Sequence, residues 1–340
     1  MPSKNKVVNP QRRKNIFSLI LRIGISGILL GYIFSKIDWE ETRIVLKSAQ
    51  PQYILYALLV FFSIHIILVW RWWIFIRALN LSVSIGTAVR YFFIGLFGNL
   101  FLPTSIGGDI IKVLGLCRES PQKAKVVASV LLDRLSGFVS IVLVASCSFL
   151  YGYRLIDDKS LGLLILLMAL FFLLLGIILF NRFLYSFVCR IFKAFPRIEN
   201  ALIALHEDIL LLRDKRQEGF KAVGLSCLSQ AILSFVFFLT AKALHQEIGF
   251  VYFLIFIPLI CMASAFPSIG GLGVREAGAA YLFGKIGVGA GIAVSLSLIN
   301  FLFMVIVGLL GGLIYVVTLS SGRLQYCASN ASAAPRETGG

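Results

Sequence analysis

Charged residues are scarce in this chain of 340 residues, where they make up 14% of the sequence. Soluble domains carry about 25% charged residues. Hydrophobic residues make up 59% of the chain. Because each membrane-spanning helix needs roughly 20 apolar residues, the chain is long enough for several crossings but not for an additional soluble domain of catalytic size. The composition therefore excludes a soluble globular protein.

The chain also lacks the sequence motifs of common enzyme and metal sites. It contains no HExxH, GxSxG, P-loop or DxD-type motif, and its six cysteines show no CxxC spacing. The three histidines, His65, His206 and His245, are far apart in the sequence. We therefore expect no catalytic residue, no metal and no cofactor.

Acidic residues are half as frequent as basic ones, 16 against 32, which gives a formal net charge of +16. In a soluble protein this excess would indicate a nucleic acid partner. Here the basic residues lie between apolar runs, as expected for cytoplasmic loops near anionic headgroups. The expected partner is therefore membrane phospholipid and not nucleic acid.

Eight apolar runs are candidates for membrane helices. They cover residues 16–35, 52–70, 84–102, 126–152, 161–181, 221–244, 250–266 and 289–319. Runs 84–102 and 250–266 are short and end at Pro103 and Pro267, each followed by paired glycines. Proline and paired glycines end a helix. These two runs are therefore candidates for hairpins that enter the membrane and return to the same side.

The distribution of Lys and Arg favours this second topology. If all eight runs cross, 12 basic residues lie inside and 17 outside; with two re-entrant hairpins, 22 lie inside and 8 outside. The positive-inside rule therefore predicts two hairpins and six full spans, with both termini in the cytoplasm.

The predicted fold class is an all-α polytopic membrane protein with about six transmembrane helices, two re-entrant hairpins and an inverted repeat. The string Ser-Ile-Gly-Gly occurs at 105–108 and again 163 residues later, at 268–271. Short, Gly/Pro-interrupted segments in corresponding positions of two halves are typical of the binding sites of transporters. The predicted divisions are a basic cytoplasmic N-terminus (1–15), a transmembrane domain (16–320) with repeat halves 16–181 and 221–320, a cytoplasmic amphipathic segment (182–220) and a disordered cytoplasmic tail (321–340).

Several charged residues lie at or near membrane depth, where a charge is costly unless it faces a partner or a polar cavity. The candidate substrate-binding residues are Arg134, Arg275, Asp109, Glu276, Asp133, Asn99 and Lys112. Two interpretations stay open: an ion pair that holds helices together, or an anion site formed by the arginines and the helix N-termini that follow the two breaks.

Prolines and glycines around the breaks are candidates for hinges or for close approach of the backbone. They are Pro103, Gly107, Gly108, Pro267, Gly270, Gly271 and Gly273. Close packing between helices is an equally good interpretation of the glycines. A third group, Arg71 with Trp72, Trp73 and Arg77, is typical of an anchor at the inner membrane interface. Gln230 and Asn300 are weaker candidates for polar contacts.

The pattern resembles a known membrane family. The resemblance rests on Asn99-x3-Pro103-x3-Gly107-Gly108-Asp109, on Asp133-Arg134 with Gly137, and on Pro267-Ser268-x-Gly270-Gly271-x-Gly273-x-Arg275-Glu276. These residues are similar to those of the membrane domain of the lysylphosphatidylglycerol synthase/flippase family. The resemblance implies a flippase-like domain of a bacterial or archaeal plasma membrane that binds or moves a lipid.

The resemblance also implies a difference, because full-length synthases carry a soluble aminoacyl-transferase domain after the membrane part. About twenty residues follow the last apolar run here, so we expect a lipid transporter and not an enzyme. Its substrate would be an anionic or aminoacylated phospholipid, bound in a cavity lined by Asp109, Arg134, Arg275 and Glu276. A membrane-embedded glycosyl- or other lipid-linked transferase, and a scaffold for a lipid-modifying enzyme partner, are the alternatives. The sequence leaves open whether the protein is a monomer or a homodimer.

Overall fold

A computed structural model describes residues 47–101, 107–152, 159–181, 215–264 and 272–320, together with a few single residues between 40 and 44 and at 183 and 185. Several predictions lie outside this part of the chain. They are the first apolar run (16–35), most of the amphipathic segment (182–214), the tail (321–340), and the residues Pro103, Pro267, Gly270 and Gly271.

The described part of the chain is helical, which confirms the predicted all-α class. In chain order its helices are α3 (Pro51–Ala78), α4 (Ile85–Phe101), α5 (Gly107–Glu119), α6 (Lys123–Gly152), α7 (Lys159–Phe180), α10 (Arg216–Ala243), α11 (Phe250–Ala263), α12 (Val274–Gly284) and α13 (Ala290–Ser320).

Five of these helices, α3, α6, α7, α10 and α13, are long and apolar enough to cross a membrane. They coincide with five of the six predicted full spans; the sixth, 16–35, lies outside the described residues. The protein is therefore a multi-pass membrane protein. The two remaining apolar helices, α4 and α11, have 17 and 14 residues and coincide with the two short runs.

The helices occur in two series with the same order and similar lengths. Helices α3, α4, α5 and α6 have 28, 17, 13 and 30 residues, and α10, α11, α12 and α13 have 28, 14, 11 and 31. The first helices of the two series, α3 and α10, also end in the same way. Asn80 and His245, each two residues after the last helical residue of α3 or α10, have positive φ angles of 54° and 58°, a conformation that commonly ends a helix.

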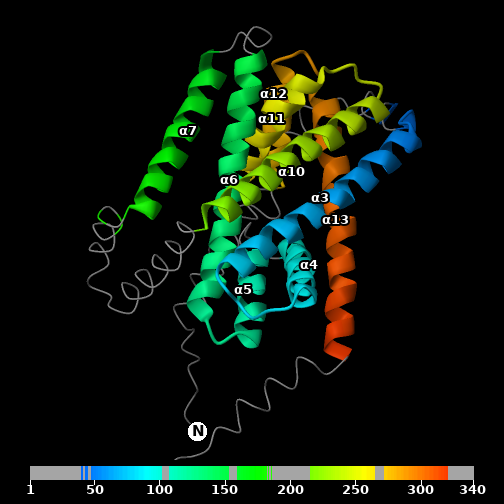
Figure 1. Cartoon of the computed structure of the whole chain (residues 1–340). Helices are drawn as coiled ribbons and strands as arrows, with labels where there is room; N and C mark the ends of the chain where they lie inside the picture. The colour runs from blue at the N-terminus through cyan, green and yellow to red at the C-terminus, as the bar shows by residue number, and fades with distance from the viewer. Residues whose placement is uncertain are drawn as a thin grey trace, which may run out of the picture.

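The two short helix pairs lie at opposite ends of the molecule (Figure 1). Helices α3 and α10 pack along each other through the middle, with α4 and α5 on one side of them and α11 and α12 on the other. The long helices α6 and α13 run past both pairs: α6 contacts α5 and α11, and α13 contacts α4 and α12. Any movement of one pair relative to the other must therefore involve α6 and α13.

Glycines set the close contact between α4 and its neighbours. A Cβ on Gly108 of α5 would lie 2.3 Å from the backbone oxygen of Gly95, and a Cβ on Gly311 of α13 would lie 2.0 Å from that of Phe93. Side chains cannot be accommodated at such distances, so the two helices approach α4 through bare backbone. This close packing holds the start of α5 against Asn99 near the end of α4.

Candidate functional site

A cavity of about 350 Å³ opens where the first helix pair meets α3, α6 and α10. Ligand sites of small molecules typically have about 300–1,000 Å³. The apolar residues that line it include Leu68, Phe138, Ile141 and Met304. The charged or amide side chains in the lining are those of Arg71, Asn99, Asp109, Lys112, Asp133, Arg134 and Gln230. The cavity therefore suits a ligand with a charged group and an apolar portion.

Two ion pairs connect three helices at the cavity. Arg71 of α3 donates from Nε to Oδ1 of Asp133 on α6 over 2.7 Å, and from Nη1 to the Ser226 hydroxyl over 3.1 Å. Arg134 of α6 donates from Nε to Oδ2 of Asp109 on α5. Asp109 and Asp133 are buried. Each carboxylate thus has a guanidinium partner.

Lys112 lies between the two ion pairs. Its Nζ is 3.5 Å from Oδ1 of Asp109 and 3.9 Å from Oδ2 of Asp133. The ammonium group also faces two aromatic rings, at 4.5 Å from the Phe92 centroid and 5.2 Å from that of Trp72. Such contacts are favourable for a cation. Lys112 therefore joins both pairs into one cluster of five charges.

The start of α5 is fixed by a side chain from α4. Asn99 accepts a hydrogen bond at Oδ1 from the backbone N–H of Gly108 over 2.7 Å. The bond satisfies one of the N–H groups that are free at a helix start. Asp109, in the first turn, also lies where a carboxylate interacts favourably with the helix dipole. The first turn of α5 thus aims its acidic residue at the cavity.

The second helix pair has its own charged group, Arg275 and Glu276, which are not among the residues that line the cavity. Glu276 of α12 is fully buried and accepts a hydrogen bond from the backbone N–H of Gly273 over 2.7 Å, so it caps its own helix. It also accepts from Nη2 of Arg275 over 2.7 Å and from the Ser297 hydroxyl over 3.0 Å. Gly273, with φ 86°, provides the turn into the helix.

Arg275 also contacts α13. Its Nε donates to the Ser297 hydroxyl over 2.8 Å, and its guanidinium lies 5.1 Å from the ring centroid of Phe301. The structure therefore brings together Asn99, Asp109, Lys112, Asp133 and Arg134 around one cavity, and places Arg275 and Glu276 in a separate group between α12 and α13.

Comparison with known proteins identifies the family. Residues 19–312 match the family described as the lysylphosphatidylglycerol synthase TM region. The chain belongs to this family. It is also 26% identical, over 329 residues, to a UPF0104 membrane protein of Pyrococcus horikoshii, an alignment that covers 87% of this chain and 95% of that protein. No solved structure shows a significant match.

From the sequence, Arg71 was not assigned to the candidate site, although its side chain lines the cavity. Arg71 and Trp72 were expected at the membrane interface with Trp73 and Arg77, and this interpretation is wrong for both. Arg71 is only 8% exposed and pairs with Asp133, while Trp72 is fully buried and donates from Nε1 to the Ser129 hydroxyl. A usable signal existed: Arg71 lies inside a long apolar run, as Arg134 does. The neighbouring tryptophans favoured the other interpretation.

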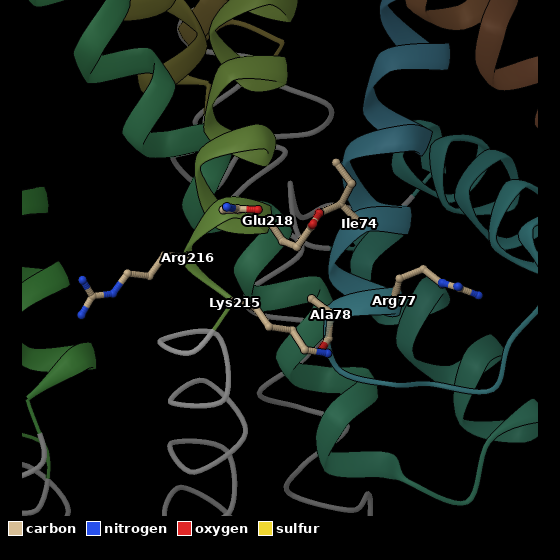
Figure 2. Close-up of a pocket in the computed structure, with 7 residues that line it drawn as sticks. Ile74, Arg77, Ala78, Lys215, Arg216 and Glu218 are labelled. Atoms are coloured by element: carbon tan, nitrogen blue, oxygen red, sulfur yellow. The ribbon is translucent and has the colours of Figure 1, made fainter.

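A wider pocket of about 620 Å³ lies where α3 ends and α10 begins, and includes Arg77, Lys215, Arg216 and Glu218 (Figure 2). Its two arginines point away from each other in this view. Lys215 donates from Nζ to the backbone oxygen of Ala78 over 2.7 Å and thereby joins the two helix ends. The two arginines do not converge here, so this pocket is a weaker candidate site than the cavity that contains Asp109, Asp133 and Arg134.

Metal ligands do not gather within the described part of the chain, where no group of three or more His, Cys, Asp or Glu side chains is arranged to hold an ion. The two acidic residues of the cavity are engaged by basic side chains. The charged groups of this site are therefore joined to one another by ion pairs.

Proposed function

We propose that the protein binds the headgroup of an anionic or aminoacylated phospholipid in the cavity and moves the lipid across a bacterial or archaeal plasma membrane. The observation that supports this is the composition of the cavity wall. Three basic side chains face two carboxylates, so the fully ionised site has one positive charge in excess. An anionic headgroup would neutralise it, while the apolar lining residues would accept the start of the acyl chains.

The ion pairs provide a route for headgroup binding. A phosphate entering the cavity would take over the guanidinium of Arg134, whose side chain is 35% exposed, from Asp109. Arg71 would provide a second donor from α3. Charge-assisted hydrogen bonds from arginines to phosphate are among the strongest polar contacts in proteins. The side-chain amide of Asn99 and the unpartnered Oε1 of Gln230 would orient the rest of the headgroup.

The fold suggests how the site would open to each leaflet. In this proposal the pairs α4–α5 and α11–α12 are re-entrant hairpins that enter from opposite sides, and the two four-helix series are inverted repeats. Their matching order and lengths, the shortness of α4 and α11, and the position of the pairs at opposite ends support it. Rocking of one repeat against the other is the common mechanism of such transporters. Both termini would be cytoplasmic.

The test uses purified protein in liposomes with a fluorescent phosphatidylglycerol in both leaflets. A membrane-impermeant quencher reaches only the outer leaflet, so translocation raises the quenched fraction beyond that of protein-free vesicles. We expect this increase with the wild type and with Arg77→Ala, a control for a basic residue outside the cavity, and its loss with Arg134→Ala. A correctly folded Arg134→Ala protein with wild-type translocation would contradict the proposal.

A further inference from the structure

The cluster at the cavity contains more cations than carboxylates. Each carboxylate already has a guanidinium partner, Arg71 for Asp133 at 2.7 Å and Arg134 for Asp109. Lys112 lies farther from both, at 3.5 and 3.9 Å. Once each arginine is matched with one carboxylate, no carboxylate of the cluster remains to balance the positive charge of Lys112.

Lys112 lies in surroundings that make such a surplus charge unfavourable. Its side chain is only 7% exposed, and its Nζ faces the rings of Phe92 and Trp72. A charge removed from water is costly unless an opposite charge compensates it. The contact with the two rings offsets part of this cost but does not neutralise the charge.

Within the cluster, the ammonium of Lys112 is the group suited to release a proton. Guanidinium groups stay protonated in proteins, and lysine readily loses its proton when buried. The charges that act on Lys112 are those of Asp109, Asp133, Arg134 and Arg71. Among the other lining residues, Phe92 and Asn99 from α4 and Gln230 from α10 do not titrate, and α11 adds the thiol of Cys261.

We infer that Lys112 couples headgroup binding to uptake of a proton: it is a neutral amine in the free site and an ammonium group when an anionic headgroup is bound. The proton comes from water and binds to the lone pair of Nζ; no bond of the lipid changes. The free site then has two guanidiniums and two carboxylates, and the loaded site adds one negative and one positive charge. The site is thus neutral in both states.

This inference rests on the proposed function and adds to it the coupling ion. If each translocated anionic headgroup travels with one proton, no net charge crosses the membrane with it. A pH gradient, and not the membrane potential, would then drive transport. Arg134 and Arg71 would select the headgroup, while Lys112 would set the stoichiometry of the proton.

The inference is tested by titration calorimetry of the protein in phosphatidylcholine nanodiscs with dioctanoyl phosphatidylglycerol. Its phosphodiester stays anionic, so it releases no proton of its own. Measurements in buffers with different ionisation enthalpies give the number of protons bound with each lipid. We expect one for the wild type, with an affinity that falls tenfold for each unit rise of pH.

Two variants separate Lys112 from other groups. Lys112→Arg keeps the charge permanently, so it should bind the lipid without proton uptake and without pH dependence. Lys112→Met, which serves if the first variant does not fold, should bind more weakly, also without proton uptake. The control Lys123→Arg replaces an exposed lysine at the start of α6 and should behave as the wild type.

The outcomes distinguish the two proposals. Wild-type binding without proton uptake, or unchanged uptake in Lys112→Arg, would overturn the role of Lys112 and leave the proposed function standing. If the wild type does not bind the lipid while it remains folded, the proposed function fails, and the inference fails with it.

Discussion

The two helix pairs have the same place in the chain's two series but use their charges differently. Asp109 and Glu276 are each the third residue of the second helix of their pair. Asp109 reaches across to Arg134 at a cavity, whereas Glu276 binds its own helix start and Ser297 and is fully buried. An acid engaged through another helix can exchange its partner; an acid that caps its own helix is fixed.

The long helices show the same contrast. The eleventh and twelfth residues of α6 are Asp133 and Arg134, and those of α13 are Asn300 and Phe301. Asn300 donates to the Thr240 hydroxyl and to the backbone oxygen of Leu296. Phe301 offers its ring to Arg275. In our interpretation the first half is therefore the ligand site and the second half is its structural counterpart.

The largest expected effect is a difference in protein stability between substitutions of Glu276 and of Asp109. Glu276→Ala removes the fully buried partner of Arg275, whose side chain is only 12% exposed, and should destabilise the protein by about 3–5 kcal/mol, seen as a large loss of thermal stability in detergent. Asp109→Ala should cost clearly less, because Arg134 is exposed enough to be hydrated in the cavity. Equal losses of stability would show that the first acid is as structural as the second.

The next largest effect is expected for a substitution of Asn300, the eleventh residue of α13. Asn300→Asp places a carboxylate at membrane depth beside a backbone oxygen and a hydroxyl, with no basic side chain among its hydrogen-bond partners. A charge at this depth costs about 2.5–3.5 kcal/mol, so the melting temperature should fall. The conservative Asn300→Gln is the control. An unchanged melting temperature for Asn300→Asp would indicate a cation or water site in the second half.

The two short helix pairs should also differ in their tolerance of alanine. Gly108→Ala places a Cβ against the backbone oxygen of Gly95, and overpacking of this kind costs about 1–3 kcal/mol. In the other pair, a Cβ on Gly278 would make an ordinary contact of 3.6 Å with Ile260. Gly278→Ala should therefore be neutral or slightly stabilising in thermal unfolding. A tolerated Gly108→Ala would mean that the α4–α5 contact is loose.

The smallest expected effect concerns the wider pocket. Arg216 is exposed and points away from Arg77 (Figure 2), and surface substitutions usually change stability by less than about 0.5 kcal/mol. Arg216→Ala should leave lipid translocation in the quenching assay within twofold of the wild type. A loss comparable to that of Arg134→Ala would move the headgroup site to this pocket.

Much of the fold could be predicted from the sequence because membrane helices leave a direct signal. The five long described helices follow five long apolar runs, and the two short apolar runs became α4 and α11. The pairing of Asp109 with Arg134 could also be anticipated, because the sequence predicts both residues at membrane depth, where a charge needs a partner.

The contacts that hold Arg275 and Glu276 against α13 could not be predicted from the sequence. Their motif after a Pro-Gly break resembles the one around Asp109, but their contacts depend on Ser297 and Phe301 of α13. Those residues have no charge and gave no signal in the sequence. Arg71 was missed for the opposite reason, since its adjacent tryptophans suggested a membrane interface.

The most direct measurement of the central claim is the position at which a lipid headgroup lies. A phosphatidylglycerol with a photoreactive group on its headgroup would be crosslinked to the protein in liposomes, and the labelled peptides identified by mass spectrometry. We expect labels on α3, α4, α5 and α6 around the cavity, and much weaker labelling with Arg134→Ala. Labels concentrated on α12 and α13, and unchanged by Arg134→Ala, would contradict the assignment of the site to the first half.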